Sequence, residues 1–169
     1  MMNIVTFVMK TESTIFFGYG SRLVIEPGVE EIWNNHRQIK ARSPEAFGIL
    51  IGSCEELTGH CRIESVTTPN KLDIQSRFQF LLKDPEHQKT VDQAYRQSQG
   101  HLGYLGTWHT HPETNPNPST VDIKDWLKCE SRNPDRPLFF VIVGTKNTCV
   151  FVRIKNKFVK LTRKEPNTQ

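Results

Sequence analysis

The 169-residue sequence contains no apolar run near the length of about 20 residues that a transmembrane helix requires. The apolar stretch close to the start, residues 4–9, also lacks the basic flank and long apolar core of a signal peptide. We therefore expect a cytoplasmic protein that has no membrane partner.

Cysteine is scarce, and its spacing excludes several classes of protein. Cys54, Cys61, Cys129 and Cys149 form no C-x-x-C pair, which argues against a zinc knuckle and a thioredoxin-type redox motif. We expect these cysteines to be reduced and structural. The chain also lacks the Pro-Cys-x-x-Cys sequence that zinc-dependent nucleobase deaminases require, so that class is excluded.

Strong charge asymmetry, internal repeats and long linkers are absent as well. The formal net charge is only +4, and basic residues are spread along the chain except in the run 155–164. This run alternates basic and apolar residues, which predicts an edge strand with a solvated face. No row of stacking aromatic residues lies beside it, so we expect no nucleic-acid partner. One domain is predicted over residues 13–162, with an N-terminal segment at 1–12 and a mobile tail at 163–169.

Apolar periodicity and turn residues predict alternating strands and helices. Strands are expected at 14–17, 22–25, 47–52, 61–67, 103–111, 138–143 and 149–154, and helices at 27–39, 85–98 and 119–128. Strands separated by a few helices are typical of an α/β sandwich with a mixed sheet.

The most informative motif lies within residues 106–122 and has the pattern H-x-H-x7-S-x2-D. Side chains two apart on a strand share a face, so His109 and His111 can bind one metal ion. A proline-bounded loop can then fold the helix start, with Ser119 and Asp122, back over the imidazoles. Two histidines, one carboxylate and a water make an open catalytic zinc site, which predicts one Zn²⁺ per chain. Alternatively, Ser119 and Asp122 form only a helix capping box.

A catalytic zinc site also needs a general base that is not a ligand. Glu45 immediately precedes the apolar run 46–52, and burial at the end of such a strand raises a carboxyl pKa toward a useful range. The alternative is that Glu45 only caps or solvates the end of the preceding segment. Glu113 is a rival base beside the ligands, although Pro112 turns it away from the strand that carries the histidines.

The sequence resembles the JAMM (JAB/MPN) zinc metalloproteases in the order of three motifs: Glu45 before Gly-Ile-Leu-Ile-Gly, then His-Thr-His-Pro, then Ser-x-x-Asp. Members of this family cleave isopeptide or peptide bonds after ubiquitin-like tails. The resemblance covers about residues 15–154. It implies a single-domain three-layer sandwich with the JAB/MPN, cytidine-deaminase-like fold. It also implies the following roles: zinc ligands His109, His111 and Asp122; general base Glu45; oxyanion stabiliser Ser119.

Phe47 departs from this pattern, because many relatives have a small residue, often glycine, at this position. We therefore expect Phe47 to shape the approach of the substrate. The segment 68–80 lies where related proteases contact an extended substrate tail, which makes Asp73 and Arg77 candidate substrate-binding residues. The alternative is that the two pair with each other as a loop staple. Phe78 and Phe80 are expected to be core anchors.

The chain is also similar to the JAB-type deconjugating proteases of CBASS anti-phage operons, which are single domains. This similarity lies in the sequence of residues 104–113 and 116–119 and in Trp126. This similarity implies a protein substrate with an extended C-terminal tail, namely a ubiquitin-like protein or a cGAS-like enzyme conjugated to targets. It also implies a functional link to an E1/E2-like conjugating enzyme. Two alternatives are processing of sulfur-carrier precursors and a non-catalytic MPN scaffold, although scaffolds typically lack the ligands that this chain keeps.

Overall fold

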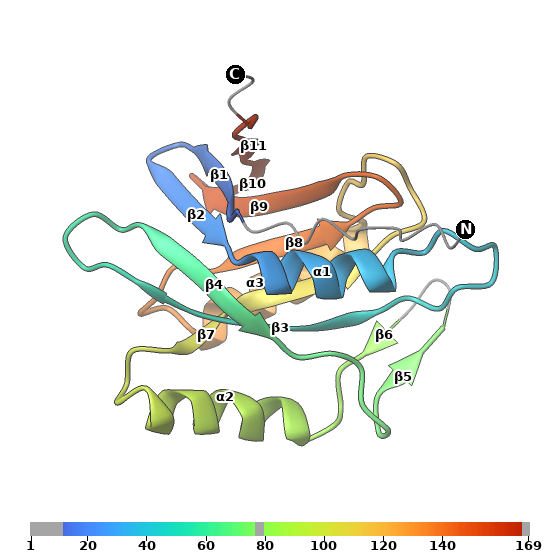
Figure 1. The fold of residues 1–169 in the computed structure, drawn as a ribbon, viewed down its shortest axis with the longest axis horizontal. Helices are drawn as coiled ribbons and strands as arrows, with labels where there is room; N and C mark the ends of the chain where they lie inside the picture. The colour runs from blue at the N-terminus through green and yellow to red at the C-terminus, as the bar shows by residue number, and fades with distance from the viewer. Residues whose placement is uncertain (1–11, 77–79, 167–169) are drawn as a thin grey trace, which may run out of the picture.

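The computed structural model describes residues 12–76 and 80–166, and Figure 1 labels the elements. In chain order these are β1 (Thr14–Gly18), β2 (Ser21–Ile25), α1 (Pro27–His36), β3 (Phe47–Cys54), β4 (Cys61–Val66), β5 (Ile74–Gln75), β6 (Phe80–Leu81), α2 (Glu86–Gln97), β7 (Gly103–Thr110), α3 (Thr120–Arg132), β8 (Phe139–Val143), β9 (Thr148–Ile154), β10 (Lys157–Lys160) and β11 (Thr162–Arg163). Arg77, Phe78, residues 1–11 and the end of the tail, 167–169, lie outside the described residues.

The main sheet has the strand order β10-β9-β8-β7-β3-β4-β2-β1-β11, and β5 and β6 form a separate small hairpin. The pairs β2–β4 and β7–β8 are parallel, and the other neighbours are antiparallel. The predicted mixed sheet is therefore confirmed. Strands β3 and β7 are neighbours in the middle of this order, and the candidate site lies where these two strands meet at one end.

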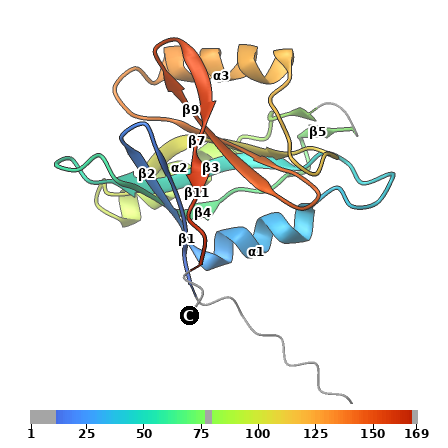
Figure 2. The same cartoon turned by 90° about the horizontal axis from the view of Figure 1, so that it is seen from above.

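Helices cover both faces of the sheet, and Figure 2 shows α1 and α3 on opposite sides of it. Trp33 of α1 packs in one apolar cluster with Leu50 and Val141. Trp126 of α3 packs on the other face of the sheet against Phe140. Helix α2 packs on that same face, against the two isoleucines that flank Leu50 in β3. Adjacent strand residues point to opposite faces, so the apolar runs fill both interfaces. The predicted three-layer α/β sandwich is confirmed.

A β-bulge interrupts the pairing of β3 with β7 just before the histidines. Ile49 lies opposite Thr107, but Ile51 lies opposite Tyr104, so β7 has one extra residue there. Gly106 occupies the bulge with a φ of +123°, and a Cβ added to it would meet the carbonyl oxygen of Phe139 at 1.8 Å. Only glycine fits this position without displacing the backbone of β8.

The basic run from residue 155 extends the sheet at both of its edges. Lys157–Lys160 form β10 beside β9, and Thr162–Arg163 form β11 beside β1. Leu161, between them, is buried and donates its amide hydrogen to Val150 O at 2.8 Å. The predicted edge strand is confirmed, and the sheet includes Arg163, which the sequence had suggested to be part of a mobile tail.

Helix α1 ends at His36, three residues before the end predicted from the sequence. Arg37 leaves the helix with extended backbone angles, and its side chain donates hydrogen bonds to Gly144 O at 2.6 Å and Thr148 Oγ1 at 3.1 Å. These contacts with the β8–β9 turn replace the next helical turn. Within the described residues, the helices are too short and polar to cross a membrane.

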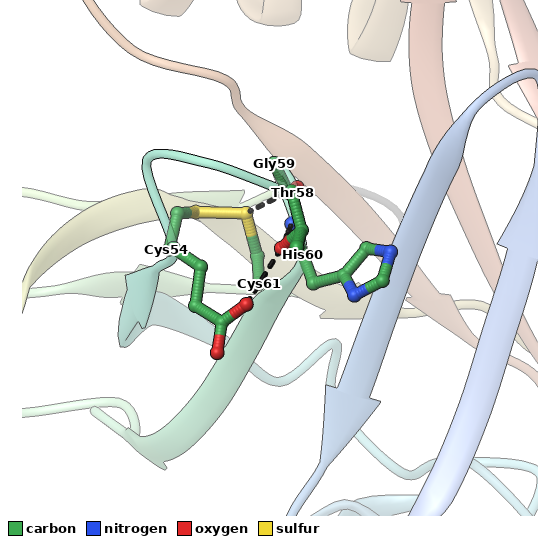
Figure 3. The surroundings of a disulfide bond; sticks show 6 residues. Cys54, Thr58, Gly59, His60 and Cys61 are labelled. Atoms are coloured by element: carbon green, nitrogen blue, oxygen red, sulfur yellow. Dashed lines mark hydrogen bonds between the residues drawn. A yellow bond between two sulfur atoms is a disulfide. The ribbon is translucent and has the colours of Figure 1, made fainter.

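The expectation that all four cysteines are reduced was wrong for one pair. Cys54 and Cys61 face each other across the β3–β4 hairpin and form a disulfide (Figure 3). Their Cα atoms are 4.0 Å apart because they are directly opposite in the strand register. A spacing of seven residues gives no local signal for such a pair, since the hairpin must close first. Cys129 and Cys149 are free thiols.

Candidate metal centre

His109 and His111 project from the end of β7 to the same side, as their spacing predicted. Their Nε2 atoms are 3.1 Å apart, and His109 is almost completely buried. Burial lowers the pKa of His109, so the neutral imidazole that a metal requires is favoured. Within the described part of the chain, the Nδ1 atoms of both histidines have no hydrogen-bond partner. The polar contacts of both rings therefore converge at Nε2.

Asp122 completes this group from the first turn of α3. Its Oδ1 lies 3.1 Å from His109 Nε2, and its Oδ2 lies 3.3 Å from His111 Nε2. Burial alone would raise the pKa of Asp122, but the two imidazoles and the Ser119 amide outweigh burial and hold the pKa well below its ordinary value. The carboxylate is thus ionised at neutral pH.

Ser119 is the N-cap of α3 and forms the capping box that the sequence allowed. The Asp122 amide donates to Ser119 Oγ at 3.2 Å, and the Ser119 amide donates to Asp122 Oδ2 at 2.6 Å. The box fixes the rotation of the first helical turn, and with it the direction of the Asp122 carboxylate. Because Oγ accepts in this contact, its own hydrogen stays available to another acceptor.

These distances fit a zinc ion. Ligands at 2.0–2.1 Å from a tetrahedral Zn²⁺ lie about 3.3 Å from one another. The two Nε2 atoms are 3.1 Å apart, and each faces a different oxygen of the Asp122 carboxylate, Oδ1 at 3.1 Å for His109 and Oδ2 at 3.3 Å for His111. The donor set is two imidazoles and one carboxylate, the ligand types that open catalytic zinc sites use. The residues present therefore suit the metal that the sequence implied.

Glu45 lies beside this group, just before β3. Ligand atoms of Glu45, His109 and His111 lie within 4.8 Å of one another, and the Glu45 side chain is buried. Burial raises the pKa of Glu45 to about 8, with His111 lowering it and Asp122 raising it further. A carboxyl group with this position and pKa can exchange protons near neutral pH.

Glu113 lies on the outer side of His111. Its Oε2 is 4.0 Å from His111 Nδ1, the ring nitrogen opposite the one that faces Asp122, and its side chain is more than half exposed. The loop that carries it is held by the β8–β9 turn, because Thr145 N donates to Glu113 O at 2.7 Å. This placement favours Glu45 over Glu113 as the group next to the metal position.

Several contacts that hold Glu45 were not predicted from the sequence. The Ala46 amide donates to Thr110 Oγ1 at 2.9 Å, and Thr110 Oγ1 donates to Gln38 Oε1 at 2.9 Å. Glu45 itself is fixed by its amide, which donates to Ser76 O at 2.8 Å, and by its carbonyl, which accepts from Gln75 Nε2 at 2.9 Å. A threonine between the two histidines was the only local signal of this network.

Phe47 does not line the surface, contrary to the expectation that it contacts substrate. Its side chain is completely buried and stacks on Phe80, with ring centroids 4.6 Å apart. Phe80 is half-buried and in turn lies 5.1 Å from the ring of His109. Phe47 can therefore influence the approach of the substrate indirectly, through the ring of Phe80 on which it stacks.

The side chain of Asp73 is also buried, and its contacts are with neighbouring loop amides and with His87 of α2. Its Oδ1 accepts from the amides of Lys83 and Asp84, and its Oδ2 accepts from the amide of Asn70 and lies 2.6 Å from His87 Nε2. These contacts give Asp73 a structural role, with His87 and backbone amides as its partners. The suggested partner Arg77 lies outside the described residues.

Fold and site together define an α/β domain in which two histidines and two carboxylates meet in a cluster that could hold a metal ion. Residues 31–155 match the family described as prokaryotic homologs of the JAB domain. This match covers most of the chain, and the chain belongs to that family. The family resemblance inferred from the sequence motifs is therefore confirmed.

Curated relatives and a solved structure agree with this assignment. The chain is 36% identical over 146 residues to a protein of Escherichia coli named CD-NTase/cGAS isopeptidase, covering 86% of this chain and 91% of that protein. A Vibrio cholerae protein of the same name is 34% identical over 87% of this chain and 88% of its own length. The solution structure of protein DSY2949 from Desulfitobacterium hafniense aligns with a TM-score of 0.52 at 27% identity, covering 78% of this chain and 83% of that one.

Proposed function

We propose that the protein is a zinc-dependent isopeptidase of the JAMM type, which removes a cGAS-like nucleotidyltransferase from the targets to which its C-terminal tail is conjugated. The single observation that carries the chemistry is the convergence of Glu45 with His109, His111 and Asp122 in a buried cluster. The names of the curated relatives support the substrate class.

His109, His111 and Asp122 would hold the ion. When bound, zinc supplies Lewis-acid polarisation of a water molecule and of the scissile carbonyl. Glu45 would take a proton from the attacking water and return it to the leaving amine, a role that suits a buried carboxyl group beside the ligands whose pKa is raised by desolvation. No covalent intermediate with a protein side chain is needed.

Ser119 would stabilise the oxyanion with its hydroxyl hydrogen. Its Oγ already accepts a hydrogen bond from the Asp122 amide. This contact fixes the hydroxyl group next to Asp122 and leaves the hydroxyl hydrogen free to donate to the oxyanion. An E1/E2-like enzyme would be the functional partner that forms the bond, which this protein then hydrolyses. The substrate presents a linear C-terminal tail on the acyl side and a lysine amine on the other.

A reporter assay tests the proposal. The tail of a cGAS-like enzyme is joined through its last carboxyl group to the amine of a fluorescent reporter, and cleavage is followed by mass spectrometry. We expect cleavage after the last residue of the tail, with loss of activity on chelation and in Glu45→Gln. A protein inert toward this reporter but active on a sulfur-carrier precursor would instead support the processing function. Inactivity toward both would favour a scaffold.

A further inference from the structure

A groove leads away from the metal centre between α2 and α3. Its volume is about 740 Å³, and the side chain of Asp122 lies at one end of it together with Phe80. Ile49 and Thr107 form part of the floor. The groove thus reaches the candidate site at Asp122, and Thr107, Tyr104 and Gly103 of β7 line it as well.

The length of the groove suits an extended peptide. Helix α3 rises about 15 Å between Asp122 and Arg132, since each residue adds 1.5 Å. An extended chain covers that span with about five residues at 3.3 Å each. A side chain about five positions from the scissile bond would therefore lie beside the C-terminal end of α3.

Two arginines line that far end, while the carboxylates that line the groove, those of Asp92, Asp122 and Asp125, lie elsewhere along it. Arg132 is exposed and lines the groove, and no carboxylate within residues 12–76 and 80–166 pairs with it. Arg136 also lines it, and a Cβ added to Gly103 would lie 3.6 Å from Arg136 Nη1, so this guanidinium covers the start of β7. Its Nη2 lies 3.4 Å from Asp135 Oδ2 in an exposed ion pair, which leaves Nη1 on the groove side. The nearer wall is more balanced, because Lys128 lies 3.7 Å from Asp125.

We propose that Arg132 and Arg136 form a binding site for an acidic side chain of the substrate tail, about five residues before the scissile carbonyl. Guanidinium groups bind carboxylates with paired hydrogen bonds, so the two arginines suit an Asp or Glu. The inference rests on the proposed function, because it assigns the groove to the substrate of that reaction.

The acyl side of the bond is the part of the substrate that fits this groove. In an isopeptide, the amine side is a lysine side chain, whose flexible methylenes carry no sequence information. The acyl side is a linear C-terminal tail that can lie extended between two helices. Recognition by Arg132 at the far end would select the tail common to all conjugates rather than the diverse targets.

The experiment places charge along the tail of the reporter described above. Each of residues three to eight before the scissile carbonyl is replaced in turn by Glu and by Lys, and kcat and KM are measured. With the wild-type protein, we expect Glu to be preferred over Lys by about fivefold in kcat/KM, mostly through KM, with the maximum near the fifth position. The preference should weaken at high salt.

Arg132→Glu and Arg136→Glu should abolish or reverse this preference, so that a Lys in the tail becomes favoured. The matched control is Lys124→Glu, the same charge change on an exposed residue of α3 that does not line the groove. Thermal melting confirms that the variants are folded. A wild-type enzyme that cleaves every charge variant at one rate overturns the inference. One that cleaves no reporter contradicts the proposed function instead.

Discussion

Thr110 and Ala46 are joined by two hydrogen bonds across the end of β7. The Ala46 amide donates to Thr110 Oγ1 at 2.9 Å, and the Thr110 amide donates to Ala46 O at 2.8 Å. Because Thr110 separates the two histidines and Ala46 follows Glu45, this pair fixes the distance between the proposed base and the proposed ligands.

Thr110→Val should therefore reduce turnover by about tenfold or more while zinc is retained, since small displacements of reacting groups are costly. The buried Ala46 amide and Gln38 would lose a partner, which should lower the free energy of unfolding by about 1–3 kcal/mol. Steady-state kinetics and urea unfolding measure the two effects. Thr110→Ser keeps the hydroxyl and should restore turnover. Full activity in Thr110→Val would refute the positioning role.

Metal analysis after mild dialysis should find about one zinc per chain. The double variant His109→Ala/His111→Ala should lose it, because two of the three proposed protein ligands are removed. His101→Ala is the control, since His101 is exposed and lies just before the start of β7, whereas the cluster lies at the end of that strand. Full zinc occupancy in the double variant would mean that the ligands are elsewhere.

Glu45→Gln should keep zinc and the fold but reduce turnover by about a hundredfold or more, because proton transfer is lost while no ligand changes. Glu113→Gln should stay near the wild-type rate, since that carboxylate lies on the outer side of His111. The two variants are compared on one reporter at saturating concentration. An inactive Glu113→Gln together with an active Glu45→Gln would show that the base is misassigned.

Ser119 has two roles that substitutions can separate. Ser119→Ala should lower the free energy of unfolding by about 1 kcal/mol through loss of the helix cap, and it should slow turnover less than loss of zinc does. Ser119→Asn keeps a capping side chain but removes the hydroxyl. We expect it to recover stability in thermal unfolding without recovering turnover. If Ser119→Asn is as active as wild type, the hydroxyl has no part in the reaction.

Asp73 should make the stability of the protein depend on pH. Burial would raise the pKa of Asp73, but hydrogen bonds from the Asp84 and Asn70 amides, from His87 and from the Lys83 amide outweigh burial and hold it below its ordinary value. The stabilisation is therefore present above the unfolded-state pKa of about 3.9 and is lost as pH falls through the folded-state value.

Asp73→Asn should thus lower the free energy of unfolding by about 1–3 kcal/mol at pH 7, because its amide hydrogens face backbone donors. The difference from wild type should shrink in urea unfolding below about pH 4. Asp92→Asn, at an exposed position on α2, should have little effect at either pH. An equal loss in Asp73→Asn at both pH values would argue against an ionised carboxylate.

The sequence by itself determined the parts of the site that depend on neighbours along the chain. Strand periodicity placed His109 and His111 on one side, and the Ser119 and Asp122 spacing gave a capping box at the start of α3. Both patterns involve residues two or three positions apart in the sequence. At such short separations the backbone geometry of the strand or helix fixes the direction of each side chain. The alternating elements likewise predicted an α/β sandwich with a mixed sheet.

Only the tertiary structure decided how distant segments meet. The pairing of Phe47 with His109 in β3 and β7, extended by two residues, brings Glu45 opposite His111. Long-range packing also buried Phe47 beneath Phe80 and closed the disulfide between Cys54 and Cys61. It aligned α3 with β7, so that Arg132 lies along the same groove as the metal centre. Such contacts depend on strand register and helix packing, which no short stretch of sequence specifies.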